Sequence, residues 1–462
     1  MLTLLGLSFI IVSLLVSKKI YNTYFSPLSI FTLCWGGSTG LYGLKLINYN
    51  MYSTQYTLSF IITWFLFLLG TILSYKPLKK NNKMPNKDKR KLMGRPFFYV
   101  LSIINFLIIV LYGILNVYEF ANGNVITYFQ NSELIRIEFF KRSIYGNTLV
   151  ISVLESLSYM CVGLAFISGT LSSMNNGIKM KIIGYLPLLS AFIFSTYYFA
   201  RTPILLAFGF FILSKLISNL ALYNKLILFK LNWKKILLAI IGLNIFNYIA
   251  YIRDDGMKKT FELTSNLTAF QLPENYLTTT IVSNYVYLTS SLANLQSYID
   301  SGVKYNSATF GAVTFEPIYS MLNRLGIMDT ESTSFSGQLI VQQSSLLYNL
   351  WGGEINLNTA TAWDSIISDF GYTGLFIIHL LMGYISNKLF INIVYKNSIS
   401  KLFQMYILVI IFYFILFSVF VNSISAYFKP FFLGLVIVFF YELLNRLKGS
   451  NGSSLGSCDQ NI

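Results

Sequence analysis

The sequence predicts an all-α polytopic integral membrane protein with about eleven (10–12) transmembrane helices and a large, mainly helical outer loop domain before the last three spans. Two observations carry this prediction. The chain of 462 residues is 55% hydrophobic but only 11% charged, whereas soluble domains carry about 25% charged residues. Apolar runs long enough for a helix to cross the ~30 Å hydrocarbon core also recur along nearly the whole chain.

The first apolar run is followed by Lys18 and Lys19 instead of being preceded by them. This order is the reverse of a cleaved signal peptide, so we expect a retained first span with the N-terminus outside. The apolar runs place the spans near residues 2–17, 25–47, 57–75, 97–118, 148–171, 182–200, 203–223, 236–252, 371–390, 402–422 and 427–445.

The distribution of positive charge fixes the orientation of these spans. Alternation from an outside N-terminus puts 22 of the 34 Lys and Arg residues in or beside short inner loops, and ten in the outer segments. This bias is the positive-inside pattern of membrane proteins, and it predicts a cytoplasmic C-terminus. The net charge of +16 is therefore explained by membrane orientation, and nucleic acid is not expected as a partner.

The same alternation divides the chain into four parts. Residues 1–252 hold spans one to eight with a medium outer loop at 119–147, and 253–370 form a large outer domain. Residues 371–448 hold the last three spans, and 449–462 form a flexible tail. The outer domain has 11 acidic and 5 basic residues and regularly spaced apolar and aromatic residues. A loop of this length is usually functional or disordered, and its apolar pattern favours a folded cap.

The positive residues on the two sides differ in kind. Inside, three of 22 are arginine, whereas outside five of ten are: Arg136, Arg142, Arg201, Arg253 and Arg324. Lysine is sufficient for orientation, but the planar guanidinium also grips phosphate or carboxylate with two hydrogen bonds. The outer face is therefore predicted to hold an anion. The alternative is pairing with loop acids, such as Asp254 beside Arg253. Arg201, in the hairpin "YFARTPIL", has no acidic neighbour in sequence.

Three acidic residues are candidates for a catalytic base. Glu155 lies inside an apolar run, where ionisable residues are functional candidates by default, and both a buried ion pair and a base remain open. Asp364 and Asp369 precede the ninth span in "NTATAWDSIISDFGYTG". Five positions apart, they share a helix face only loosely, and Asp364 equally fits a helix cap.

No metal or cofactor is expected from the residue patterns. The three cysteines, Cys34, Cys161 and Cys458, have no ligand spacing. The one histidine, His379, lies in the middle of a span, where we favour packing or a hydrogen bond over catalysis. An aspartate pair holding a metal, as in nucleotide-sugar transferases, is not expected at Asp254 and Asp255, because nucleotide sugars are cytoplasmic and these residues are predicted outside.

Topology and three short segments together carry a family resemblance. The topology has many spans, a medium outer loop and a large outer loop before the last three spans. The segments are "FARTPIL" at 199–205, "TFEPIYSMLNRLG" at 314–326 and "NTATAWDSIISDFGYTG" at 358–374. In these features the chain resembles the Wzy-type oligosaccharide repeat-unit polymerases, which make O-antigen and capsule polysaccharides in bacterial envelopes.

The resemblance implies a substrate, a location and a set of roles. In the bacterial inner membrane, a sugar hydroxyl of one undecaprenyl-diphosphate-linked oligosaccharide would attack C1 of the chain on another carrier and displace undecaprenyl diphosphate. The outer arginines would hold the diphosphate, and Asp364, Asp369 or Glu155 would take the proton. Membrane lipids and a chain-length-regulating co-polymerase are the implied partners. The residues expected to stack on sugar rings are Tyr285, Tyr287, Trp351 and Trp363.

Three other classes share some of these features. A lipid-linked oligosaccharide flippase, which is a transporter, would show paired halves with short loops, and the 118-residue outer segment counts against it. An O-antigen ligase would carry a histidine in its large outer loop, and this loop has none. A sensor or assembly factor without enzymatic activity would not need arginines at the membrane surface.

Overall fold

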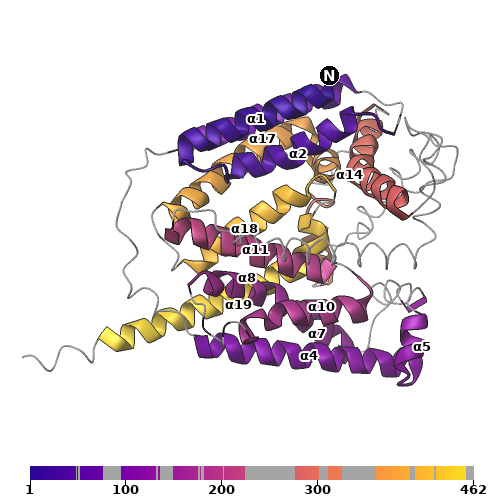
Figure 1. The fold of residues 1–462 in the computed structure, drawn as a ribbon, viewed down its shortest axis with the longest axis vertical. Coiled ribbons are helices and arrows are strands. Elements are labelled where there is room, and N and C mark those ends of the chain that lie inside the picture. The colour runs from indigo at the N-terminus through magenta and orange to yellow at the C-terminus, as the bar shows by residue number, and fades with distance from the viewer. Residues whose placement is uncertain are drawn as a thin grey trace, which may run out of the picture. The chain divides into compact units, whose positions relative to one another are not determined.

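The computed structural model describes most of the predicted spans and parts of the two outer segments. The described residues are 1–47, 49, 53–75, 95–131, 134–135, 149–174, 177, 180, 182–200, 202–223, 276–300, 311–324, 361–395, 401–420 and 423–453. Each regular element within these ranges is a helix, as Figure 1 shows. Within the same ranges, seven helices are long and apolar enough to cross a membrane. The predicted all-α membrane class is therefore confirmed.

Most of the predicted spans correspond to helices, although the total of eleven stays a prediction. The span predicted at 236–252 lies outside the described residues. The long apolar helices are α1 (Leu2–Tyr21), α3 (Thr54–Leu73), α4 (Arg95–Ala121), the pair α7 (Leu149–Ser158) and α8 (Met160–Met174), α11 (Thr202–Tyr223), α17 (Ala362–Val394) and α19 (Ser423–Ser453). Three predicted spans are shorter helices: α2 (Pro27–Gly43), α10 (Leu186–Tyr198) and α18 (Leu402–Phe417).

Three differences from the predicted spans are the largest. The single span predicted at 148–171 is broken at Tyr159 into α7 and α8. Helix α17 begins at Ala362 instead of residue 371, and it continues through Gly371, whose φ of 64° interrupts the helical geometry. Helix α19 runs to Ser453, into the predicted tail. The physical reasons for the first two differences lie in side-chain hydrogen bonds described below.

Helix α1 exposes an apolar stripe. Leu4, Ile11 and Leu15 are 74%, 57% and 62% exposed, and their spacing puts them on one helix face. An exposed stripe of this kind is uncommon on a soluble monomer, but a bilayer provides apolar surroundings for it. The stripe supports the membrane assignment.

The chain divides into two compact units. The first comprises Met1–Lys76, Phe229–Lys388 and Ile411–Ala426. The second comprises Pro77–Leu228, Leu389–Ile410 and Tyr427–Ile462. Each unit therefore combines segments that are far apart in the sequence.

In the first unit, α1 and α2 lie side by side (Figure 1) with their backbones in contact. A Cβ atom on Gly6 would come 2.3 Å from the Gly36 carbonyl oxygen, which leaves no room for a side chain. Buried hydroxyls also join the helices, at 2.8 Å between Ser13 and Thr32. Small residues and interhelical hydrogen bonds are the usual means of packing helices in lipid, where apolar burial gives little driving force.

Helix α14 (Tyr276–Asp300) belongs to the predicted outer domain and packs on α2 and α3 in the first unit. The Tyr285 hydroxyl donates to the Leu41 carbonyl at 2.8 Å. Further along, the Ser53 amide donates to Gln296 Oε1 at 3.1 Å. Leu41 lies near the predicted outer end of the second span, and Ser53 lies between the second and third predicted spans on the outer side. Both hydrogen bonds therefore join α14 to residues at or near the predicted outer surface.

In the second unit, α10 lies along α4, and α5 (Val125–Gln130) stands at the C-terminal end of α4 (Figure 1). The Tyr128 hydroxyl on α5 donates to the Tyr197 carbonyl at the end of α10, at 2.7 Å. Both residues are predicted near the outer surface. The Tyr223 hydroxyl donates to the Ser173 carbonyl at 3.0 Å, at the predicted inner ends of α11 and α8. These contacts agree with the predicted alternation of spans within this unit.

Candidate functional site

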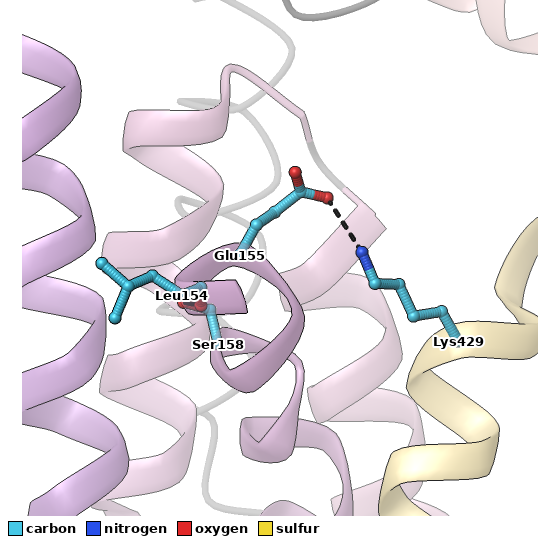
Figure 2. Close-up of polar contacts among 4 residues, drawn as sticks. All are labelled: Leu154, Glu155, Ser158 and Lys429. Carbon is cyan, nitrogen blue, oxygen red and sulfur yellow. Dashed lines mark hydrogen bonds and ion pairs between the residues drawn. The ribbon is translucent and has the colours of Figure 1, made fainter. Parts of the chain in front are cut away.

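An ion pair lies at the predicted outer end of the second unit. Glu155 on α7 faces Lys429 on α19, with 3.5 Å between Oε1 and Nζ (Figure 2). The Glu155 side chain is 18% exposed and the Lys429 side chain 46% exposed. The carboxylate is therefore the covered member of the pair, and the ammonium is the member open to its surroundings.

A break between two helices positions Glu155. Helix α7 ends at Ser158, and the carbonyls at its end lack the amide donors that a continuing helix would supply. The buried Asn105 of α4 replaces them, because its side-chain amide donates to the Leu157 carbonyl at 3.1 Å. The Ser158 hydroxyl donates to the Leu154 carbonyl at 2.8 Å (Figure 2). Glu155 consequently lies in the last turn of a short helix that ends before α8 begins.

A close approach of two helices brings Lys429 to this position. A Cβ atom on Gly163 would lie 2.7 Å from the Gly434 Cα, so the backbones of α8 and α19 are in contact. Lys429 lies between Tyr427, whose dihedral angles are not helical, and Pro430. Since proline has no N–H to donate, it interrupts the helical hydrogen bonds at this turn.

Three tyrosines lie within electrostatic range of the carboxylate. Tyr112, Tyr159 and Tyr198 are each close enough to Glu155 to interact with it electrostatically. The Tyr159 ring also lies beneath the cation, 6.0 Å from Lys429 Nζ to the ring centroid. We call these five residues the Glu155 cluster. It combines an acid, a cation and three hydroxyl groups that can donate or accept hydrogen bonds.

The hairpin that carries Arg201 begins at this cluster. Tyr198 is the last residue of α10, and Phe199 adopts a left-handed conformation with φ of 50°. The hairpin is closed by Ser195, whose hydroxyl accepts from the Ile204 amide at 3.0 Å. The predicted two-helix hairpin is confirmed. Arg201 itself lies outside the described residues.

Asp364 caps a helix. Its Oδ2 accepts from the Thr361 amide at 2.6 Å, and its own amide donates to the Thr361 hydroxyl at 3.3 Å. This reciprocal pair is a capping box at the start of α17, and it explains why the helix begins at Ala362. Of the two interpretations left open for Asp364, the geometry supports the cap.

Asp369 ties a loop to the same helix. It is buried, and its two carboxylate oxygens accept from the Val313 amide at 3.1 Å and the Thr314 amide at 2.6 Å. These amides lie in a turn that begins at Gly311, whose φ is 93°. The carboxylate therefore holds the turn that leads into α15 (Glu316–Arg324) against the first turns of α17.

Trp363 is fully buried in an aromatic arrangement. Its ring stacks on Trp35 with 4.1 Å between centroids, and its Nε1 donates to His379 Nε2 at 3.0 Å. Because that nitrogen accepts, the His379 Nδ1 carries the proton and donates to the Leu375 carbonyl at 2.7 Å. The predicted packing and hydrogen-bonding role of His379 is confirmed. Sugar stacking on Trp363 would require this packing to open.

The remaining predicted site residues are either buried, described in backbone alone, or outside the described residues. Tyr285 is buried against Leu41, and burial raises the pKa of its hydroxyl. Tyr287 lies on α14 and Arg324 ends α15, but their side chains are not among those described. The residues that lie wholly outside the described ranges are Arg136, Arg142, Arg201, Arg253 and Trp351.

Sequence reasoning missed the cation of the ion pair. The sequence leaves an ion pair open for Glu155 without naming its partner, and the structure pairs it with Lys429. Lys429 is the one charged residue in "SAYFKPFF", at the predicted outer end of a span. That isolation was the available indication.

Within the described residues, no group of three His, Cys, Asp or Glu side chains is arranged to hold a metal ion. No family model, no curated protein and no solved structure matches the chain.

Proposed function

We propose that the chain is a repeat-unit polymerase of the bacterial inner membrane, acting on undecaprenyl-diphosphate-linked oligosaccharides at the outer surface. The observation that carries the proposal is the Glu155 cluster, which places a carboxylate and a cation at the predicted outer end of a helical bundle, beside the hairpin of Arg201. A polymerase of this kind needs a base for a sugar hydroxyl and positive charge for a diphosphate leaving group.

Glu155 is the proposed base. Among the three candidate carboxylates, Asp364 and Asp369 are buried and accept backbone amide hydrogen bonds that hold α17. Protonation of either would weaken those bonds. Glu155 is partly exposed, and its described partner is a side chain that can move away.

The proposed reaction is a direct displacement. The acceptor hydroxyl oxygen forms a bond to C1 of the donor sugar while its proton passes to the Glu155 carboxylate. The bond between C1 and the diphosphate oxygen breaks, and undecaprenyl diphosphate leaves with the electron pair. Arg201, with other outer arginines, would stabilise the charge that develops on this leaving group.

The test uses a strain that lacks the chain and the purified protein. A polymerase predicts surface polysaccharide reduced to a single repeat, restored to a ladder by the wild-type chain. Purified protein should convert lipid-linked repeat units to longer chains and release undecaprenyl diphosphate. Absence of all surface sugar, with no chain lengthening in vitro, would refute the proposal and favour the flippase or the ligase.

Arg201 offers a sharper test of the diphosphate role. Replacing it with lysine keeps the charge but removes the two-pronged donor. We expect Arg201→Lys to shorten or abolish the ladder at normal expression. A normal ladder from this variant would contradict the role of the guanidinium, and Lys448→Arg at the predicted cytoplasmic end serves as the matched control.

A further inference from the structure

We propose that Lys429 is an exchangeable cation: it pairs with Glu155 at rest and transfers to the phosphate groups of the bound lipid carrier, which frees Glu155 to accept a proton. This inference rests on the proposed function and adds a residue and an order of events to it.

The geometry of the pair is that of a contact that opens easily. It joins Nζ to Oε1 at 3.5 Å, and Lys429 is 46% exposed. Exposed ion pairs contribute little to stability, because water and salt screen the attraction. A diphosphate, which has more charge and more acceptor oxygens than one carboxylate, would compete for the ammonium effectively.

The difference in exposure gives the exchange a direction. A ligand from the surroundings meets the exposed Lys429 before the more covered Glu155. The Tyr159 ring beneath Lys429 offers the cation a second attraction that does not depend on Glu155. The cation–π contact with Tyr159 can therefore stabilise the ammonium while it moves from Glu155 to the phosphate groups.

The exchange also addresses a conflict within the proposed mechanism. The Lys429 ammonium lies 3.5 Å from Glu155 Oε1, where it stands in the way of a sugar hydroxyl that approaches this oxygen. If lipid diphosphate draws the ammonium away, Oε1 is open to the acceptor hydroxyl when the donor is in place. Binding of the donor would thereby be coupled to activation of the acceptor.

The experiment measures binding of radiolabelled undecaprenyl diphosphate to the full-length protein in phosphatidylcholine nanodiscs. We expect Lys429→Met to weaken binding about tenfold, as the loss of one charge-assisted contact. Glu155→Gln should tighten it about threefold, because a competing carboxylate is removed. Lys429→Arg should bind within about threefold of wild type. Lys388→Met, an exposed lysine at the predicted inner side, is the matched control.

The outcome depends on whether Lys429→Met and Glu155→Gln change the affinity for undecaprenyl diphosphate in opposite directions. A structural pair predicts that Lys429→Met and Glu155→Gln change binding in the same direction, or not at all, and either result would overturn the exchange. Lys429→Arg and Glu155→Gln keep the test valid if Lys429→Met does not fold. Competition by inorganic diphosphate distinguishes recognition of the phosphates alone from recognition of the lipid carrier. Loss of the Lys429 effect in phosphatidylglycerol nanodiscs would show binding of any anionic headgroup and refute the diphosphate assignment.

The lysine exchange and the polymerase activity can be refuted independently of each other. The expected binding pattern in a protein that makes no polymer would support the exchange and refute the polymerase. If the wild-type protein makes polymer but Lys429→Met binds undecaprenyl diphosphate normally, the polymerase is supported and the exchange is refuted.

Discussion

The acidic residues of the two units differ in what holds them. In the first unit, Asp364 and Asp369 are buried, and backbone amides of a helix start and a neighbouring turn donate to them. In the second unit, Glu155 is partly exposed and pairs with the side chain of Lys429. Removing backbone donors means unfolding a segment, whereas a lysine side chain can rotate away. The carboxylates of Asp364 and Asp369 therefore hold backbone segments in the first unit, whereas that of Glu155 in the second unit is paired with another side chain.

The largest effect is expected at Glu155. Replacement by glutamine removes the proposed base while keeping the shape of the side chain, and we expect polymer synthesis by purified protein to fall about a hundredfold. The free energy of unfolding should change by at most about 1 kcal/mol, because the ion pair is partly exposed. Asp300→Asn, at the exposed end of α14, is the control. Full activity of Glu155→Gln would show that Glu155 is not the base, and that its role does not differ from those of Asp364 and Asp369.

The next effect is expected at Asp369, and it concerns stability. In Asp369→Asn, an NH₂ group would face one of the two backbone amides that now donate to the carboxylate. We expect the free energy of unfolding to fall by about 3 kcal/mol, measured by denaturant titration in detergent micelles. Activity per folded molecule should remain. A stable but inactive variant would instead identify Asp369 as part of the catalytic machinery.

A smaller effect on stability tests how the ion pair is assembled. Gly163→Ala puts a methyl group 2.7 Å from the Gly434 Cα, where backbone meets backbone, and should destabilise the protein by about 2 kcal/mol. It should also lower activity, because α19 must shift together with Lys429. Gly37→Ala is the matched control, since a Cβ there meets nothing within 4 Å. Equal behaviour of the two variants would argue against a close α8–α19 contact.

The smallest effect is expected at Asp364. Asp364→Ala removes one side of the capping box, and loss of a cap typically costs about 1 kcal/mol. Activity per folded molecule should be unchanged in the polymer assay. A loss of activity without a loss of stability would return Asp364 to the list of candidate bases.

The sequence by itself determined the fold class and the positions of most spans. Length and hydropathy suffice for this, because crossing an apolar layer requires long apolar helices whatever their neighbours are. It also identified the hairpin of α10 and α11, the hydrogen-bonding role of His379 and the two possible roles of Asp364.

Only the tertiary structure decided which partners these residues have. Glu155 and Lys429 are far apart in the sequence, and they meet because glycines at 163 and 434 let two helices touch. The break at Tyr159 likewise depends on Asn105 from another helix. The hydropathy of neighbouring residues in the sequence predicts whether a residue lies in lipid or in water. Which residue it contacts depends on packing between segments that are distant in the sequence. For this reason the sequence identified Glu155 as a candidate, and the fold supplied its lysine.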